Sequence, residues 1–347
     1  MTSVATPGSV HLNARVKLDV AGRTDLGLER EINQDQFFIA TLQRRLAVWD
    51  TSLPPTSRGW LPPSTDGTLM VVADGMGGTD GGEIASSVAV RSVSEYVCNV
   101  MPWVDAKQRE MDAAVDAGPV PLRATIPGVR TGLHHALVQG DSDVRDAAVS
   151  AGGSDMGTTV TLAYLLWPLL YVAHVGDSRC YLLRDGQLSQ LTTDHTLAEK
   201  MKQRTEVEID ESSPWHHILW NALGGGEYAA IGPEVHRHDL QLGDVILVCS
   251  DGLTKHATDE EIVNAVASSD SAAEASERLI AIANADGGTD NTTVVIARCL
   301  SSEAPAPDGE VEHPVESDAP TQVIGKADLG DDEPTVVIKG NPFGDES

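Results

Sequence analysis

The sequence predicts an α+β domain in which a few helices pack on the outside of a β core. Short apolar runs rich in β-branched residues recur along most of the chain, as in buried strands. A few segments instead place apolar residues on one stripe at helical spacing. Of the 347 residues, 41% are apolar but only 4% are aromatic, which is enough for a core of aliphatic side chains. Strands mixed with one-sided helices favour helices that cover a β core.

Seven runs are predicted to be strands because each is short, apolar and bounded by turn residues. The apolar stretch 160–175 contains Pro168 and is too short to cross a bilayer, so it is interpreted as two strands joined at a turn. Residues 184–187 predict a hairpin turn, with Asp185 as an ordinary turn residue. The predicted strands are 16–20, 69–73, 160–166, 169–175, 180–183, 245–249 and 294–297.

Three helices carry clear signals. Residues 83–97 place one set of apolar residues on a single stripe: Ala85, Val88, Ala89, Val93, Tyr96 and Val97. Thr258 and Glu261 have the spacing of a capping box, as do Ser271 and Glu274, and each pair precedes an amphipathic segment. Each of these two pairs therefore predicts the start of a helix.

The composition divides the chain into one folded domain and three irregular segments. Residues 301–347 hold twelve acidic and two basic side chains. This segment has too few apolar groups to offset the conformational entropy lost on ordering, which predicts a disordered acidic tail. Residues 50–67 are rich in proline and predict a long inserted loop. Residues 1–14 are expected to be flexible, so the folded domain is predicted to span 15–300.

Charge and cysteine content exclude several classes of function. The net charge of −28 disfavours nucleic acid and anionic membranes as partners, because both attract basic surfaces. The four cysteines form no CxxC pair, which disfavours a zinc finger or a redox motif. Residues 1–12 lack the pattern of a signal peptide. These observations predict a cytoplasmic protein with no membrane or nucleic-acid partner.

Aspartates lie where the apolar strands begin or end. A carboxylate at the end of a buried strand is unfavourable unless a cation or donor compensates it, and several together repel one another. A divalent cation resolves both problems, and all-oxygen ligands favour Mg²⁺, Mn²⁺ or Ca²⁺ over zinc or copper. The aspartates in question are Asp35, Asp74, Asp177, Asp251 and Asp290.

Seven motifs around these aspartates occur in one order, and this order resembles the PPM family, the type 2C protein phosphatases, in particular its bacterial members. The resemblance covers about residues 15–299. It implies a four-layer α-β-β-α sandwich of two antiparallel sheets flanked by helices, and a mobile flap at about 196–222. The motifs are REINQD at 30–35, VADGMGG at 72–78, MGTT at 156–159, HVGDSR at 174–179, LTTDH at 191–195, CSDGL at 249–253 and GGTDNTTVV at 287–295.

The resemblance implies two bound Mn²⁺ or Mg²⁺ ions. Asp74 would bridge both ions, and the Gly75 carbonyl would be a further ligand. Asp251 and Asp290 would complete the shell of the first ion. Asp35 would hold the second ion through water.

The resemblance also implies a third, weaker metal site at Asp177 and Asp251. Arg30 would bind the substrate phosphate, because a guanidinium matches phosphate oxygens. A hydroxide bridging the two ions would attack phosphoserine or phosphothreonine directly, with Arg30, Asp74 and Asp251 as the catalytic residues. The implied enzyme is a monomeric protein serine/threonine phosphatase that acts on phosphoproteins and opposes a serine/threonine kinase.

Two positions depart from the family pattern. Met76 stands where animal members have a histidine that is a candidate general acid, and Gln34 stands where many members have glutamate. These departures keep open a second function, a catalytically weak pseudophosphatase that binds phosphoproteins or regulates a kinase. A calcium-binding module is a third reading, but no Asp-x-Asp-x-Asp loop is present. His216 and His217, in the flap, are interpreted as a surface pair packing on tryptophan.

The acidic tail contains two similar segments. Thr321 and Thr335 each follow a proline and precede an isoleucine by three residues. This spacing resembles the phosphothreonine motif that forkhead-associated domains prefer. The hypothesis is that a kinase phosphorylates one of these threonines and that a forkhead-associated domain protein then binds it.

Overall fold

The computed structural model describes residues 16–44, 65–77, 81–100, 128–152, 156–205, 209–210, 213–225 and 230–301. All of these belong to one compact unit, Met1–Glu303. The N-terminal segment 1–14, most of the insertion at 50–67, and Thr321 and Thr335 in the tail lie outside the described residues. Within the described part of the chain, no helix has the length and apolar character needed to cross a membrane.

The first sheet has five antiparallel strands in the order β1-β11-β10-β7-β8. Its central strand β10 is buried along its whole length, as its run of five apolar residues requires. Strands from opposite ends of the domain are neighbours here, since β1 pairs with β11 over ten residues. The strands are β1 (Val16–Asp25), β11 (Thr292–Ser301), β10 (Val245–Cys249), β7 (Arg179–Arg184) and β8 (Gln187–Gln190).

The second sheet follows the order β2-β3-β5-β6-β9, with β4 paired to the end of β3. All of its pairings are antiparallel as well. Strands β5 and β6 are buried throughout, as their continuous apolar sequences predict. The strands are β2 (Asp35–Arg44), β3 (Thr65–Gly77), β4 (Met156–Thr158), β5 (Val160–Leu166), β6 (Leu169–Val175) and β9 (Glu234–Asp239).

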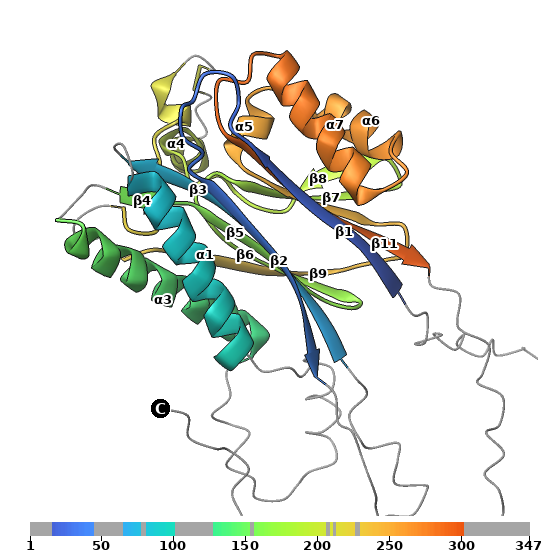
Figure 1. Cartoon of the computed structure of the whole chain (residues 1–347), viewed down its shortest axis with the longest axis horizontal. Coiled ribbons are helices and arrows are strands. Elements are labelled where there is room, and N and C mark those ends of the chain that lie inside the picture. Colours follow the sequence, from blue (N-terminus) through green and yellow to red (C-terminus); the bar gives the residue numbers. More distant parts are fainter. Residues whose placement is uncertain are drawn as a thin grey trace, which may run out of the picture. The chain divides into compact units, whose positions relative to one another are not determined.

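Helices cover the outer face of each sheet, which confirms the four-layer α-β-β-α architecture (Figure 1). Helices α1 (Gly81–Val100) and α3 (Val129–Ser150) pack on the second sheet, and α6 (Asp259–Ala267) and α7 (Ala272–Ala285) pack on the first. Alternation along β3 shows how one strand serves two layers. Val71 joins the core under α1 and α3, whereas Met70 and Val72 join the core between the sheets.

Local signals in the sequence account for several boundaries. Thr258 and Glu261 form the expected capping box at the start of α6. Ser271 caps α7 by accepting a hydrogen bond from the Glu274 amide, but the Glu274 carboxylate accepts from Asp270 instead of completing the box. The β7–β8 hairpin turns at Asp185 and Gly186, whose φ angles are 51° and 77°.

Other boundaries differ from the sequence-based expectation. Strand β3 begins at Thr65, so its first three residues fall within the segment expected to be an inserted loop. Helix α3 and strand β9 were not predicted. The buried residues of α3 include Val129, Leu133, Leu137 and Val144, which recur at helical spacing, so the signal for this helix was present in the sequence.

Candidate active site

Strand ends from both sheets bring the predicted aspartates to one edge of the sandwich. Asp35, the first residue of β2, pairs directly with Asp74 of β3. Asp177 follows β6, and Asp251 follows β10 and begins the short helix α5 (Asp251–Thr254). Asp290 precedes β11, the neighbour of β10. The five aspartates are far apart in the sequence, and the pairing of the strands brings them close together in the fold.

These residues surround a cavity of about 660 Å³. Six of the seven predicted site residues line this cavity, and only Asp35 lies behind its wall. Asp185, at the β7–β8 turn, is not among the lining residues, in agreement with its interpretation as an ordinary turn. The six lining residues are Arg30, Asp74, Gly75, Asp177, Asp251 and Asp290.

Asp35 is a buried carboxylate with only half of its oxygens paired. It is 2% exposed, and its Oδ2 accepts a hydrogen bond of 2.7 Å from the Ser250 hydroxyl. Its Oδ1 is buried and has no hydrogen-bond partner. Burial raises the pKa of Asp35 to about 7 although the Ser250 hydroxyl stabilises the charged form. The site therefore needs a further positive group or donor near this carboxylate.

Asp74 and Asp177 are in the same unfavourable position. Burial, reinforced by the charges of Asp35 and Asp251, raises the pKa of Asp74 well above its ordinary value. Burial, with the nearby charge of Asp251, raises the pKa of Asp177 to about 7. Carboxylates that resist ionisation in this way are typical of a site built for a compensating cation.

Asp290 differs because basic side chains already compensate it. Its Oδ1 lies 2.8 Å from an Arg30 guanidinium nitrogen, and its Oδ2 lies 2.7 Å from the Lys255 ammonium. Burial alone would raise the pKa of Asp290, but the Lys255 hydrogen bond and the charges of Lys255 and Arg30 lower it below its ordinary value. Lys255 also lies 2.6 Å from Asp251 Oδ2.

Glycine at position 75 lets the chain pass close to the start of α1. A Cβ atom at Gly75 would lie 2.1 Å from the Gly82 carbonyl oxygen and 2.7 Å from the Gln34 carbonyl oxygen. The Gly75 amide donates to this same Gln34 carbonyl over 3.2 Å. No larger residue fits, so the two glycines fix the backbone beside Asp74.

The donor set fits a hard divalent cation. The lining groups offer carboxylate and carbonyl oxygens, and Asp35 Oδ1 and Asp251 Oδ1 are buried without partners. Among the described residues, no three His, Cys, Asp or Glu side chains converge on a single point. The ion pairs of Lys255 with Asp251 and Asp290 hold two of the carboxylates in another arrangement.

Sequence reasoning missed three residues that organise the site. Ser250 donates to Asp35, and Lys255 joins Asp251 to Asp290. The Asn291 side chain accepts from the Gln34 amide and donates to the Leu26 and Ile32 carbonyls, which ties down the loop that carries Arg30. Ser250 and Asn291 stand beside predicted aspartates, and their position in the motifs was the available signal.

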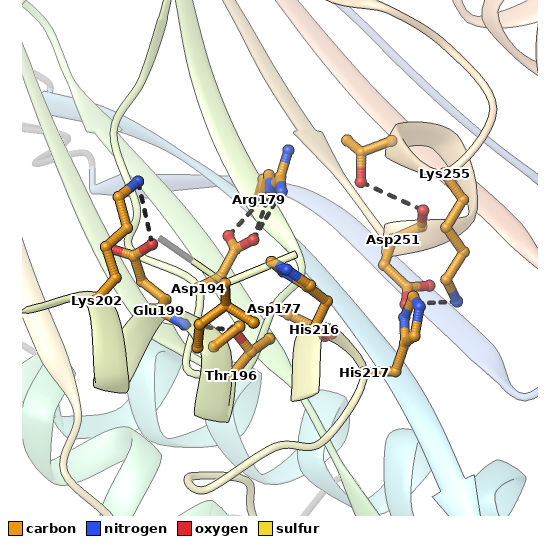
Figure 2. A pocket seen from close by; sticks show the side chains of 13 residues that line it. Asp177, Arg179, Asp194, Thr196, Glu199, Lys202, His216, His217, Asp251 and Lys255 are labelled. Carbon is orange, nitrogen blue, oxygen red and sulfur yellow. Dashed lines mark hydrogen bonds and ion pairs between the residues drawn. The ribbon is translucent and has the colours of Figure 1, made fainter. Parts of the chain in front are cut away.

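The flap adjoins the site. It contains α4 (Leu197–Thr205) and a short 3-10 helix, Pro214–His216. His216 and His217 line a second cavity of about 630 Å³ together with Asp177, Asp251 and Lys255 (Figure 2). His217 and Met76 also line the first cavity. His216 and His217 thus line cavities at the site, whereas His134 and His135 lie exposed on α3.

Two buried histidines, His174 and His195, pack beneath Trp220 of the flap. His174 of β6 is 1% exposed, with Nδ1 2.8 Å from the Thr161 hydroxyl and Nε2 3.1 Å from the Thr193 carbonyl. Its ring centroid lies 4.8 Å from that of His195, which in turn contacts Trp220. Burial lowers the pKa of His174 to about 3. The imidazole is therefore neutral in the folded protein at neutral pH.

This burial predicts an acid-dependent loss of stability. The unfolded chain binds a proton at His174 near pH 6.5, whereas the folded chain does so only near pH 3, so acidification favours unfolding between these values. We expect His174→Gln to reduce the pH dependence of the unfolding free energy by up to about 1.4 kcal/mol per pH unit in this window. Urea denaturation in chelator between pH 5 and 8 measures this, with exposed His134→Gln as the control. Equal slopes for wild type and His174→Gln would contradict the prediction.

Comparison with known proteins identifies relatives with the same architecture. The family model "Protein phosphatase 2C" matches residues 60–293. The chain is 31% identical over 288 residues to the serine/threonine protein phosphatase PstP of Mycobacterium tuberculosis, a match that covers 82% of this chain and 46% of PstP. It is 30% identical to the protein phosphatase PhpP of Streptococcus pneumoniae, covering 68% of this chain and 88% of PhpP.

The fold comparison agrees with the sequence comparison. The crystal structure of the PstP catalytic domain in complex with two manganese ions superposes with a TM-score of 0.59 at 28% identity, covering 83% of this chain and all of that one. The chain spans about half the length of the M. tuberculosis relative. The matched residues include Asp74, Asp177, Asp251 and Asp290, which line the cavity, and the chain belongs to the protein phosphatase 2C (PPM) family.

Proposed function

We propose that this chain is a metal-dependent protein serine/threonine phosphatase. The observation that carries the proposal is the gathering of four aspartates from both sheets at one cavity, with the buried Asp35 paired to one of them and the Arg30 guanidinium at the same cavity. The names of the PstP and PhpP relatives and the two manganese ions of the PstP structure support it. The proposed substrates are phosphoserine and phosphothreonine on proteins, and the proposed biological role is to oppose a serine/threonine kinase.

The oxygen donors of the cavity would hold two Mn²⁺ or Mg²⁺ ions. Asp74 would contribute to both, with the Gly75 carbonyl as a further ligand, Asp251 and Asp290 would contribute to the first, and Asp35 would contribute to the second. Asp177, together with Asp251, would provide a weaker third site. When bound, such ions activate water as a nucleophile and neutralise the charge that develops on a transferring phosphoryl group.

Arg30 is placed to bind the phosphate. Its side chain is 49% exposed and lines the cavity, and Asp290 fixes one end of the guanidinium at 2.8 Å. Its remaining N–H groups are available to phosphate oxygens, which a planar guanidinium binds in pairs. Arg30 would thus orient the phosphoryl group toward the aspartates and stabilise negative charge on its oxygens as the bond to the leaving oxygen breaks.

A hydrolysis assay tests the proposal. Wild-type protein is expected to release phosphate from a phosphothreonine peptide with Mn²⁺ but not with excess chelator, and Asp251→Asn is expected to lose most of this activity. Hydrolysis that neither chelator nor Asp251→Asn reduces would contradict it. Binding of the phosphopeptide without hydrolysis would instead favour the pseudophosphatase that the Gln34 and Met76 departures suggest.

The tail suggests a further partner. We propose that phosphorylated Thr321 or Thr335 recruits a forkhead-associated domain protein, on the sequence pattern alone. Capture of such a domain by phosphorylated but not by unphosphorylated tail peptides would support this, and equal capture by both would remove it.

A further inference from the structure

Lys255 bridges two of the aspartates that would hold the first metal ion. It follows α5 and lies four residues after Asp251, so one helical turn brings its ammonium back to 2.6 Å from Asp251 Oδ2. The same ammonium lies 2.7 Å from Oδ2 of Asp290, a residue on the neighbouring strand-end segment. Lys255 lines both cavities, and Figure 2 shows it beside Asp251 and opposite the pairs that Arg179 and Lys202 form.

The two ion pairs occupy oxygens that a metal would need. Asp290 is engaged on both sides, since Oδ1 contacts Arg30 and also accepts from the Asn291 amide, while Oδ2 contacts Lys255. Asp251 keeps one buried oxygen, Oδ1, without a hydrogen-bond partner. An ammonium and a divalent cation on the same carboxylate oxygens repel each other strongly in a site shielded from water. Binding of a metal through Oδ2 of Asp251 and Oδ2 of Asp290 would therefore require Lys255 to move away.

We propose that Lys255 is a tethered cation that competes with the first divalent metal ion for Asp251 and Asp290. The inference rests on the proposed function for the assignment of these two aspartates to a metal. It gives the chain an internal counter-ion that stabilises two of its crowded carboxylates and raises the metal concentration needed for loading. Lys255 is 28% exposed, so its long side chain has solvent into which it can withdraw.

A role for Lys255 as proton donor to the leaving oxygen is less consistent with its surroundings. Its two close carboxylate contacts fit a competing cation better than an acid.

Metal binding without substrate tests the inference. The full chain is titrated with Mn²⁺ by calorimetry as wild type, Lys255→Met, Lys255→Arg and Lys202→Met. Lys255→Met removes the competing charge and is expected to bind Mn²⁺ at least about tenfold more tightly, whereas Lys255→Arg keeps the charge and stays near wild type. Lys202, which pairs with Glu199 at 3.8 Å and is 63% exposed, is the control for loss of one lysine. We also expect Lys255→Met to unfold at a lower temperature than wild type in chelator, because Asp251 and Asp290 lose their counter-ion.

The outcomes separate the inference from the proposed function. If wild type binds Mn²⁺ and Lys255→Met binds it equally or more weakly, the competition is wrong while the phosphatase proposal stands. If wild type binds Mn²⁺ but hydrolyses no phosphopeptide, the phosphatase proposal fails alone. Should Lys255→Met not fold without metal, the variants are prepared with Mn²⁺ and its release into excess chelator is followed. Slower release from Lys255→Met supports the competition, and equal or faster release overturns it.

Discussion

Asp74→Asn is expected to lower the rate of phosphopeptide hydrolysis by about 10³-fold and, in chelator, to make the protein more stable than wild type. The loss of rate follows because Asp74 would contact both ions, and metal stabilisation of the transition state is worth several kcal/mol. The gain in stability follows because Asp74 is a buried carboxylate whose charge is opposed by burial and by four neighbouring aspartates. Asparagine keeps its size and removes the charge.

Two measurements check the opposite signs of these effects. Steady-state hydrolysis of a phosphothreonine peptide with Mn²⁺ gives the rate, and thermal denaturation with excess chelator gives the stability. Asp185→Asn, at the β7–β8 turn, is the matched control and should change neither, because asparagine tolerates its positive φ of 51°. A loss of activity accompanied by a loss of stability would show that Asp74 has a structural role and would contradict its assignment as a metal ligand.

Local patterns in the sequence predicted local structure well. The capping box at Thr258, the hairpin turn at Asp185 and the buried strands β5, β6 and β10 all depend on residues a few positions apart. The four-layer sandwich came from the resemblance to the PPM family. Composition and periodicity alone do not determine strand order, and the pairing of β1 with β11 joins residues more than 260 positions apart.

The sequence predicted which aspartates form the site, but not which side chains pair with them. Aspartates at strand ends indicated a cation site, and the fold brings them to one cavity. The four-residue spacing of Asp251 and Lys255 was visible in the sequence, but the second partner, Asp290, lies 35 residues further on. Lys255 reaches Asp290 because β10 and β11 are neighbouring strands, and the sequence does not reveal this pairing. The Ser250 hydrogen bond to Asp35 likewise crosses from one sheet to the other.

Gly252→Ala is expected to disrupt the site by separating two of its aspartates. Gly252 lies between Asp251 and the rest of α5, and a Cβ atom there would lie 2.0 Å from the Asn291 carbonyl oxygen and 2.9 Å from Thr292 Oγ1. Neither the backbone carbonyl nor the buried start of β11 can yield without moving the adjacent Asp290. The close approach of these two segments is what lets one ammonium reach Asp251 and Asp290 together.

We therefore expect Gly252→Ala to lower kcat/KM for a phosphothreonine peptide by about 10²-fold, since a displacement of about 1 Å in a site has effects of this size. Overpacking should also lower the free energy of unfolding by about 1–3 kcal/mol. Gly232→Ala is the matched control, because its Cβ would have only the Asn221 side chain as a neighbour, at 3.9 Å. If Gly252→Ala kept wild-type kcat/KM and Mn²⁺ affinity, the prediction would be wrong. The close packing of Asp251 against residues 290–291 would then not determine the geometry of the site. A loss in both with the fold intact would show that one missing methyl group at position 252 sets the distance between the two carboxylates.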